Sequence, residues 1–245
     1  MSEIVYCIPT YKREKLPTLD LLRVARIGPK RIIVSTQTEE DCAKISKIYE
    51  GCCTVIYAPG SCVGDNRNNL MEYCERNGYH KIVMLDDDIK SIDILSGKQN
   101  RPLTPQELES TLSYCFAQAE RNNAPMWGMY PVNNAFFQRV RTLRRSILIG
   151  TVMGITDNTL RYDETFRVKE DYELCCRVMA QGRNCLRFDV LSANAAHKSS
   201  GGCEGEWNKT SRRIYAHLLK EKYPELIELS SKPGEVKFRQ KLESI

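Results

Sequence analysis

Short apolar runs alternate with segments of helical spacing over the first ninety residues of the chain. The runs predict four buried strands, at 4–8 (ended by Pro9), 31–35, 54–57 and 81–85. Apolar positions at helical spacing predict the helices between them, at 19–26, 39–49 and 66–76. Strands that alternate with helices in this way are typical of βαβ units, so we expect an α/β fold with a mostly parallel sheet.

The second half of the chain is less regular and is interpreted as an elaboration of the same sheet. Its pattern predicts helices at 105–121, 170–181 and 211–222. It also predicts β-structure at 126–131, 146–155 and 185–191, with a basic stretch at 139–145 and a polar, basic tail after Pro233. No repeat or long Pro/Gly/Ser linker divides the chain, so we expect one domain over residues 1–245.

Composition narrows the class of protein. A chain that is 42% hydrophobic and 27% charged is typical of globular proteins. No run approaches eighteen apolar residues, and the start lacks the features of a signal peptide, so we expect a cytoplasmic protein without a membrane span. The eleven cysteines include adjacent pairs at 52–53 and 175–176 and show no C-x-x-C spacing, which favours reduced thiols over disulfides or structural zinc.

Three consecutive carboxylates, Asp86, Asp87 and Asp88, directly follow the strand predicted at 81–85. Ligands of open α/β sheets gather at the carboxyl ends of strands, and three carboxylates repel one another unless a cation neutralises them. Alternation along an extended backbone predicts that Asp86 and Asp88 share one side. Hard oxygen ligands suit Mg²⁺ or Mn²⁺, which bind diphosphates. The alternative is that the acids cap a following helix.

Positive charge is densest at Arg139, Arg141, Arg144 and Arg145. The excess of 36 Lys and Arg over 31 Asp and Glu permits an anionic partner, although a surplus that aids solubility explains it more simply. Such a run is usually only a solvated face, but with Phe136 and Phe137 beside it the cluster is also compatible with a surface for a phosphate backbone.

Several motifs occur in the order found in one enzyme superfamily. They are Ile-Val-Tyr-Cys-Ile-Pro-Thr-Tyr at 4–11, Gly-Asp-Asn-Arg-Asn-Asn at 64–69, Val-Met-Leu-Asp-Asp-Asp at 83–88, and the later segments 150–155 and 201–202. The sequence thus resembles type A nucleotide-sugar glycosyltransferases over most of residues 1–200. Within them it is most similar to the phage TET-associated glycosyltransferases, relatives of the base J glucosyltransferase. The resemblance implies a Rossmann-like, mostly parallel sheet flanked by helices, and transfer of a sugar to hydroxymethylated pyrimidines in DNA.

The same resemblance implies a nucleotide-sugar donor, which we expect to be a UDP-sugar, and a divalent Mn²⁺ or Mg²⁺ ion. Residues 1–100 would bind this donor, 101–210 would face the acceptor, and 211–245 would form a C-terminal helix and tail. The implied donor contacts are Pro9, Thr10, Tyr11, Arg13, Asp65, Arg67, Asp86 and Asp87, where Arg67 is equally well explained as a solvated helix residue. The implied metal ligands are Asp86, Asp88 and His197, although a lone histidine in a loop is more often a surface residue.

Catalytic and acceptor residues follow from the resemblance in the same way. Glu170 and Asp171 resemble the family's E-D pair, in which we expect Asp171 to be the general base of an inverting transfer. Carboxylates at a helix N-terminus also simply stabilise the helix dipole, so this alternative stays open. The small residues at 150–154 fit either a turn or a strand edge that a sugar or base approaches. The expected acceptor contacts are Met153, Gly154, Arg141, Arg144 and Arg145.

Three other functions remain compatible with the sequence. One keeps the glycosyltransferase and changes the acceptor to a glycan, a lipid or a protein. Another is a Mg²⁺-dependent nucleotidyltransferase, in which an NTP donates its nucleotide. The third is a DNA-binding module without catalysis, in which the acids merely cap a helix.

Overall fold

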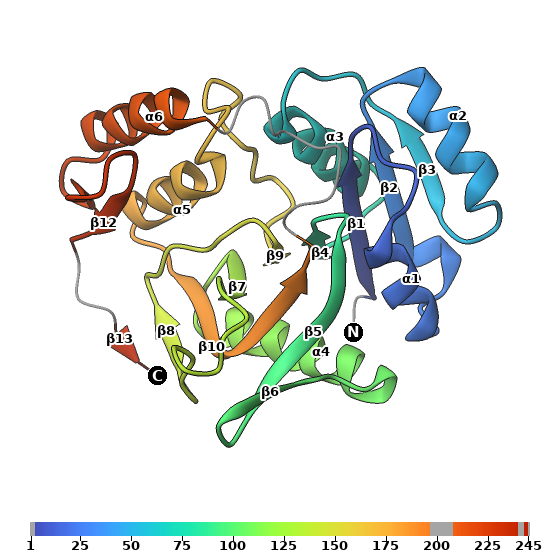
Figure 1. Ribbon diagram of the computed structural model, residues 1–245, viewed down its shortest axis with the longest axis horizontal. Helices are drawn as coiled ribbons and strands as arrows, with labels where there is room; N and C mark the ends of the chain where they lie inside the picture. Colours follow the sequence, from blue (N-terminus) through green and yellow to red (C-terminus); the bar gives the residue numbers. More distant parts are fainter. Residues whose placement is uncertain (1–2, 197–207, 240–242, 245) are drawn as a thin grey trace.

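A large twisted sheet flanked by helices forms the centre of the molecule (Figure 1). The structure is a computed structural model that describes residues 3–196, 208–239 and 243–244. Its helices are α1 (Pro17–Val24), α2 (Glu39–Ile48), α3 (Val63–Arg76), α4 (Pro105–Arg121), α5 (Glu170–Ala180) and α6 (Lys209–Lys222). The strands of its first half are β1 (Ile4–Thr10), β2 (Ile32–Thr36), β3 (Thr54–Tyr57), β4 (Lys81–Leu85), β5 (Ile89–Ser96) and β6 (Gln99–Pro102). Those of the second half are β7 (Met126–Tyr130), β8 (Thr142–Arg144), β9 (Val152–Ile155), β10 (Cys185–Ala195), β11 (Ile227–Leu229), β12 (Val236–Phe238) and β13 (Glu243–Ser244).

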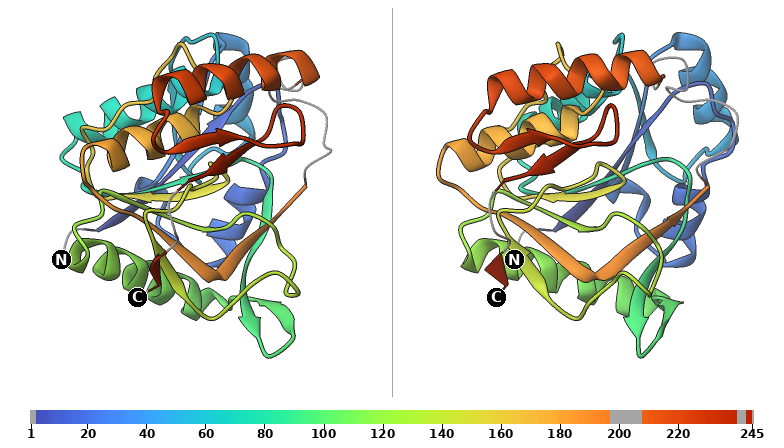
Figure 2. Two further views of the ribbon diagram at one scale, coloured as in Figure 1. Left: turned by 90° about the vertical axis from the view of Figure 1, so that its left-hand side faces the viewer. Right: turned by 60° about the vertical axis from the view of Figure 1, so that its left-hand side comes forward.

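The central run of the sheet has the order β3-β2-β1-β4-β9-β7-β10. Every strand in this run points the same way except β9, which is antiparallel to both of its neighbours. Strand β10 is bent: its first part pairs in parallel with β7, and its second part pairs antiparallel with β5 (Figures 1 and 2). The predicted α/β class with a mostly parallel central sheet is confirmed.

The alternation of side chains along β1 shows how the core forms on both faces. Tyr6 and Ile8 join one buried cluster, which contains the apolar sides of α1 and α4. Val5 and Cys7 point the other way and join a second cluster, formed with α3 and α5. Figure 2 shows these helices as layers on opposite faces of the sheet. No helix within the described ranges is both long enough and apolar enough to cross a membrane.

Most predicted elements lie within a few residues of their observed bounds, but some differ in kind. Strand β1 continues through Pro9, because β4 pairs with β1 only up to Cys7 and leaves an edge at which a proline is tolerated. The predicted β-structure at 146–151 is loop, where the Leu148 backbone N–H donates to Cys175 Sγ at 3.3 Å instead of joining a ladder. The β5–β6 hairpin and the short strands β8, β11, β12 and β13 were not predicted.

Strand β9 corrects the expectation of acceptor contacts at Met153 and Gly154. The strand lies in the sheet between β4 and β7, and Met153 is fully buried. A Cβ atom added to Gly154 would lie 1.9 Å from the indole ring of Trp127, so this glycine makes room for a core tryptophan. The close approach that the structure shows at Gly154 is made by the Trp127 ring.

Substituting Gly154 by alanine should therefore destabilise the protein strongly. Because the indole ring is itself fully buried against Phe116 and Phe188, it cannot yield without disturbing the core, and we expect a loss of about 3 kcal/mol or more in the free energy of unfolding. Urea denaturation followed by circular dichroism measures the loss. Gly28→Ala is the matched control, since no heavy atom lies within 4 Å of its added Cβ. Equal stability of the two variants would contradict this assignment.

Candidate active site at the carboxyl ends of β1 and β4

The acidic triplet lies where the sequence predicts, at the carboxyl end of a strand in the middle of the sheet. Thr10 ends β1, and Asp86 follows the neighbouring strand β4. The backbone of the triplet is fixed from two sides. The Asp86 N–H donates to the Thr151 carbonyl at 3.0 Å, and the Thr18 hydroxyl of α1 donates to the Asp86 carbonyl at 2.5 Å. The three carboxylates therefore start from a rigid turn.

Two of the three carboxylates face the segment after β1. Asp87 accepts a hydrogen bond from the Thr10 hydroxyl at 2.7 Å and pairs with the Arg13 guanidinium at 3.2 Å. The Arg13 guanidinium also lies 3.8 Å from the Asp88 carboxylate. Burial raises the pKa of Asp87 to about 6 despite these partners. Asp87 and Asp88 therefore both lie near Arg13, whereas the alternation of side chains along the backbone had predicted that Asp88 shares one side with Asp86.

Arg67 of α3 is the cation on the opposite side of the triplet. Its side chain is only 4% exposed, so the alternative of a solvated helix residue is wrong. The guanidinium pairs with Asp86 at 3.0 Å and with Glu170 at 2.8 Å, and it donates to the Gly150 carbonyl at 3.3 Å. The ring of Tyr162 lies 5.4 Å from it. Arg67 therefore connects Asp86, an expected contact of the nucleotide sugar, with Glu170 of the expected catalytic pair.

Gly150 explains part of the predicted glycine pattern. A Cβ atom at this position would lie 2.6 Å from an Arg67 nitrogen, so only glycine lets the guanidinium approach the backbone. The Gly150 N–H donates to the Asp171 carboxylate at 2.9 Å. One glycine therefore binds both the cation and one acid of the E-D pair through its backbone.

Glu170 and Asp171 are the first two residues of α5, and both are buried. The residue before them, Lys169, has a left-handed backbone with φ of 66°, which is strained for a side chain of this kind. Burial raises the pKa of Asp171, and burial together with the Asp171 charge raises the pKa of Glu170 to about 7. The pair makes specific contacts across the site, which a role in the helix dipole alone does not require.

The charges at this site do not cancel. Among the described residues, five carboxylates meet two guanidinium groups, those of Arg13 and Arg67, which leaves an excess of negative charge in a largely buried setting. Such a site favours a bound cation. Mg²⁺ and Mn²⁺ bind through one or two carboxylates together with substrate phosphates, and Asp86 and Asp88 offer such a donor set. Within the described ranges no group of three or more side chains that could hold a metal ion occurs.

The remaining residues expected to contact the nucleotide sugar or the metal ion have different surroundings. His197 lies outside the described residues; Ala196, the residue before it, donates its N–H to the Asp88 carbonyl at 3.1 Å. Asp65 accepts hydrogen bonds from the Ser61 N–H and hydroxyl at the start of α3. Pro9 is buried at the end of β1, and Tyr11 is partly exposed just beyond it.

A small hollow that the sequence did not predict, with room for about one water molecule, lies beside the acidic triplet. Residues of β7, β10 and the segment before β9 line it, among them Tyr130, Pro131, Thr151 and Ala193. Thr151, which lines it, accepts a hydrogen bond from the Asp86 N–H through its carbonyl and so connects it with the triplet. Its place on the second half of the chain is where the acceptor side was expected.

The three arginines expected to contact the acceptor do not form one surface. Arg141 is exposed and pairs with the buried Asp189 of β10 at 2.7 Å. Arg144 donates to the Asn122 side chain after α4, and Arg145 donates to the Met179 carbonyl of α5. Arg144 and Arg145 are partly buried and hold neighbouring elements together, which leaves Arg141 as the exposed member of the three.

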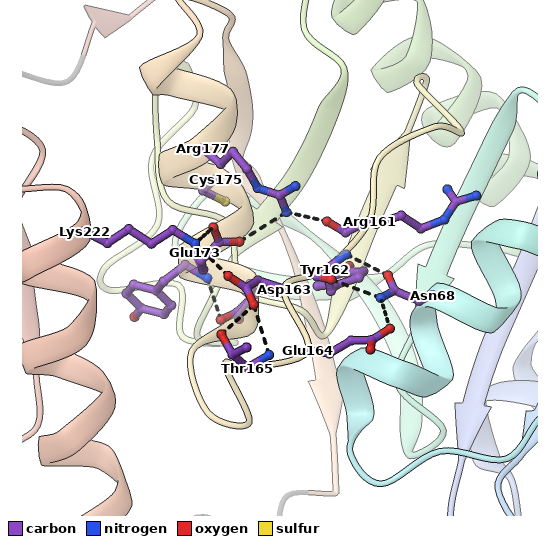
Figure 3. A network of polar contacts seen from close by, with 12 residues as sticks. Asn68, Arg161, Tyr162, Asp163, Glu164, Thr165, Glu173, Cys175, Arg177 and Lys222 are labelled. Carbon is purple, nitrogen blue, oxygen red and sulfur yellow. Dashed lines mark hydrogen bonds and ion pairs between the residues drawn. The ribbon is translucent and has the colours of Figure 1, made fainter.

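A polar network behind the site fixes the segment that leads to α5 (Figure 3). The Asn68 side chain, next to Arg67 on α3, donates to the Tyr162 carbonyl at 3.0 Å and accepts its N–H at 2.7 Å. Glu173 of α5, fully buried, accepts from Lys222 of α6 at 2.9 Å, and Lys222 also donates to Asp163 at 2.6 Å. Sequence patterns did not reveal this network, because its members are up to 154 residues apart in the chain.

The buried acids predict an unusual dependence of stability on pH. Carboxyls whose pKa is raised in the folded state hold protons that the unfolded chain has lost, so the free energy of unfolding should fall as pH rises from about 4.5 to 7. Glu170→Gln should make this fall shallower by at most about 3 kcal/mol, since one raised carboxyl is removed. Urea denaturation at a series of pH values measures the effect. Parallel curves for variant and wild type would contradict the raised pKa of Glu170.

Comparisons with known proteins agree with the sequence resemblance. Residues 5–202 match the family model described as TET-associated glycosyltransferase. A comparison with curated protein sequences finds no match.

Solved structures with related folds are distant. A protein described as a putative nucleotide-diphospho-sugar transferase, from Desulfovibrio desulfuricans, is 10% identical, with a TM-score of 0.47 over 76% of this chain and 80% of that one. Mannose-1-phosphate geranyltransferase from Thermus thermophilus is 12% identical, with a TM-score of 0.45 over 79% and 76%. A cytidylyltransferase from Leptospira borgpetersenii is 13% identical, with a TM-score of 0.46 over 91% and 96%.

Proposed function

The chain belongs to the TET-associated glycosyltransferase family, and from this premise we propose that it moves a sugar from a nucleotide-sugar donor to a 5-hydroxymethylated pyrimidine in DNA, with the help of a divalent metal ion. That it is a glycosyltransferase follows from a family match over most of the chain. The metal ion, the DNA acceptor and a role in phage DNA modification are the proposed parts.

One observation carries the proposal: the acidic triplet, Arg67 and the E-D pair meet at the carboxyl end of β4. Asp86 and Asp88 supply carboxylate oxygens for a metal ion that the donor diphosphate would share. Such an ion offsets the negative charge that develops on the departing nucleoside diphosphate. Arg13 and Thr10 hold Asp87 on one side of the triplet, and Arg67 holds Asp86 on the other, so that the carboxylates are oriented before the donor binds.

Asp171 is the proposed general base for the acceptor hydroxyl. Burial raises its pKa, which increases its affinity for a proton at the moment of transfer. The Gly150 and Tyr172 N–H groups donate to its two oxygens and fix the orientation of the carboxylate. Glu170 has a different task in this proposal, because its carboxylate pairs with Arg67 and so supports the donor side.

Donor use tests the reaction class and the metal together. We expect the protein to release UDP from a UDP-sugar only when Mn²⁺ or Mg²⁺ is present. Asp88→Asn should weaken the metal-dependent affinity for the donor by at least about tenfold at unchanged Tm, because one of the two carboxylate ligands is removed. Titration of Mn²⁺ in the presence of UDP measures the affinity. Glu14→Gln, an exposed acid in the loop before α1, is the control. Turnover of an NTP instead of the UDP-sugar would replace the proposal by a nucleotidyltransferase.

The acceptor needs its own assay. DNA with 5-hydroxymethyl pyrimidines, unmodified DNA, a polysaccharide and a peptide are incubated with the donor and metal, and intact-mass analysis of the products locates the added sugar. Sugar on a modified nucleoside alone supports the proposal. Transfer to the polysaccharide or peptide and never to DNA would overturn the DNA acceptor and leave the glycosyltransferase.

The two carboxyls of the E-D pair should separate in kinetics. Asp171→Asn should retain the KM for the donor and lower kcat for transfer by about a hundredfold or more, which is the usual contribution of a positioned base. Glu170→Gln should instead raise the donor KM, because Arg67 loses a partner and Asp86 is held less well. Steady-state kinetics with varied donor measure both constants. An Asp171→Asn variant with near-normal kcat would contradict the role of Asp171 and move the test to Glu170.

A further inference from the structure

Four large apolar side chains, with Val132 the first of them, stand exposed on the segment that connects β7 to β8, here called the 131–141 loop. Phe136 is 77% exposed, Phe137 is 54% exposed and Val140 is 82% exposed. The two rings touch edge to face, with centroids 5.0 Å apart. Contiguous exposed apolar groups of this kind mark a surface that binds another molecule more often than does a single exposed residue.

The exposure is not a consequence of a loosely packed loop. Gln138, between the exposed residues, is only 1% exposed, and its side chain accepts from Asn100 of β6 at 2.5 Å. Asn133 donates to the buried Asp93 of β5 at 2.7 Å. These buried amide contacts anchor the loop against the β5–β6 hairpin on both sides of the phenylalanines, so the two rings are held in solvent by a fixed backbone.

Positive charge accompanies the rings. Arg141 and Arg187 both pair with the Asp189 carboxylate, each at 2.7 Å, so two cations share one anion. Arg139 is exposed, and its guanidinium donates to the Phe136 and Gln138 carbonyls, which carry no formal charge. The surface around the rings therefore carries an excess of positive charge, which complements a phosphate backbone and disfavours a basic or purely apolar partner.

The same surface continues toward the active site. Pro131 begins the loop, and both Pro131 and Tyr130 line the small hollow that adjoins the acidic triplet. The Arg187 guanidinium lies 5.5 Å from the centre of the Tyr130 ring. Pro131 therefore connects the loop directly to the residues that lie beside the acidic triplet.

We propose that the 131–141 loop is the docking surface for the nucleic-acid acceptor: Arg139 and Arg141 contact phosphates, and Phe136 and Phe137 stack on bases beside the one that reacts. This inference rests on the proposed DNA acceptor and adds where the DNA binds. Chemistry on a base within a duplex requires that base to leave the stack, and aromatic side chains compensate for the stacking that is lost. Exposed arginines beside aromatic rings suit a nucleic-acid strand, in which phosphates and bases alternate.

Equilibrium binding without donor tests the surface separately from catalysis. The probe is a fluorescent DNA duplex with 5-hydroxymethyl pyrimidines, and anisotropy is recorded over a series of salt concentrations. F136A/F137A should weaken binding about tenfold or more, since stacking on an aromatic ring contributes that much per base. Val24→Ala, which removes an equally exposed apolar group from α1, should leave it unchanged.

Arg139→Gln tests the electrostatic part. Removing one phosphate contact should reduce the slope of log K against log salt by about 1, with sequence preference unchanged. Arg139 is preferred to Arg141 for this purpose, because Arg141 neutralises the buried Asp189 and its loss would disturb the fold. Both variants should retain wild-type Tm and wild-type donor hydrolysis without acceptor, since the acidic triplet is not altered.

The outcomes separate this inference from the proposed function. Wild-type DNA binding and transfer in both variants would overturn the docking surface and leave the DNA glycosyltransferase standing. A wild-type protein that neither binds nor modifies DNA but glycosylates a polysaccharide would overturn both. If light scattering showed a wild-type dimer that F136A/F137A converts to a monomer, with DNA binding unaffected, the loop would be a contact between copies of this chain and the inference would fail.

Discussion

The candidate active site depends on one buried cation. The Arg67 guanidinium bridges two carboxylates. It forms ion pairs with Asp86, which follows β4, at 3.0 Å and with Glu170 of α5 at 2.8 Å. Without it, Asp86, Glu170 and the neighbouring Asp171 would face each other in a partly buried setting, where like charges are costly. Removing one partner from such a buried network typically costs about 3–5 kcal/mol, so Arg67 is needed for the fold as well as for the site.

Other residues make room for this cation and hold it in place. Gly150 has no side chain and accepts the guanidinium on its carbonyl, while its N–H holds Asp171. Tyr162 covers the guanidinium, and Asn68, the residue after Arg67, fixes the backbone of Tyr162 with two hydrogen bonds. The arrangement links α3, the segment before α5 and the loop before β9. A change in any of these segments is therefore expected to reach the carboxylates through Arg67.

The sequence predicts well those features that depend on neighbouring residues. The strands 54–57 and 81–85 and the helix 105–121 have the predicted bounds, because their apolar periodicity and their flanking turn residues are local signals. The position of the acids at a strand end is likewise local. The β5–β6 hairpin had a usable signal as well: Gly97, with φ of 62°, lies in a two-residue turn between Ser96 and Gln99, a pattern typical of hairpins.

Features that depend on sheet order were beyond the sequence. Arg67, Asp86 and Glu170 meet because β9 inserts antiparallel between β4 and β7, and no pattern along the chain predicts that insertion. The same insertion puts Met153 and Gly154 into the core and leaves Thr151 beside the acids. Side chains within one basic stretch separate for a similar reason, since β8 pairs with β10 and commits Arg144 and Arg145 to neighbouring elements.

The net charge of +5 is not spread evenly, because the protein has one region with an excess of negative charge and another with an excess of positive charge. The site at the end of β4 has an excess of carboxylates, and the 131–141 loop has an excess of guanidinium groups. The carboxylates at the end of β4 would repel a polyanionic acceptor, and the arginines of the 131–141 loop would attract it. The loop would therefore hold the acceptor, and only its reacting group would come close to the carboxylates. A metal ion and its diphosphate need the opposite arrangement, because carboxylates attract the ion that the diphosphate shares. In the proposed reaction, where donor and acceptor are both anionic, this separation of charge would let the two bind side by side.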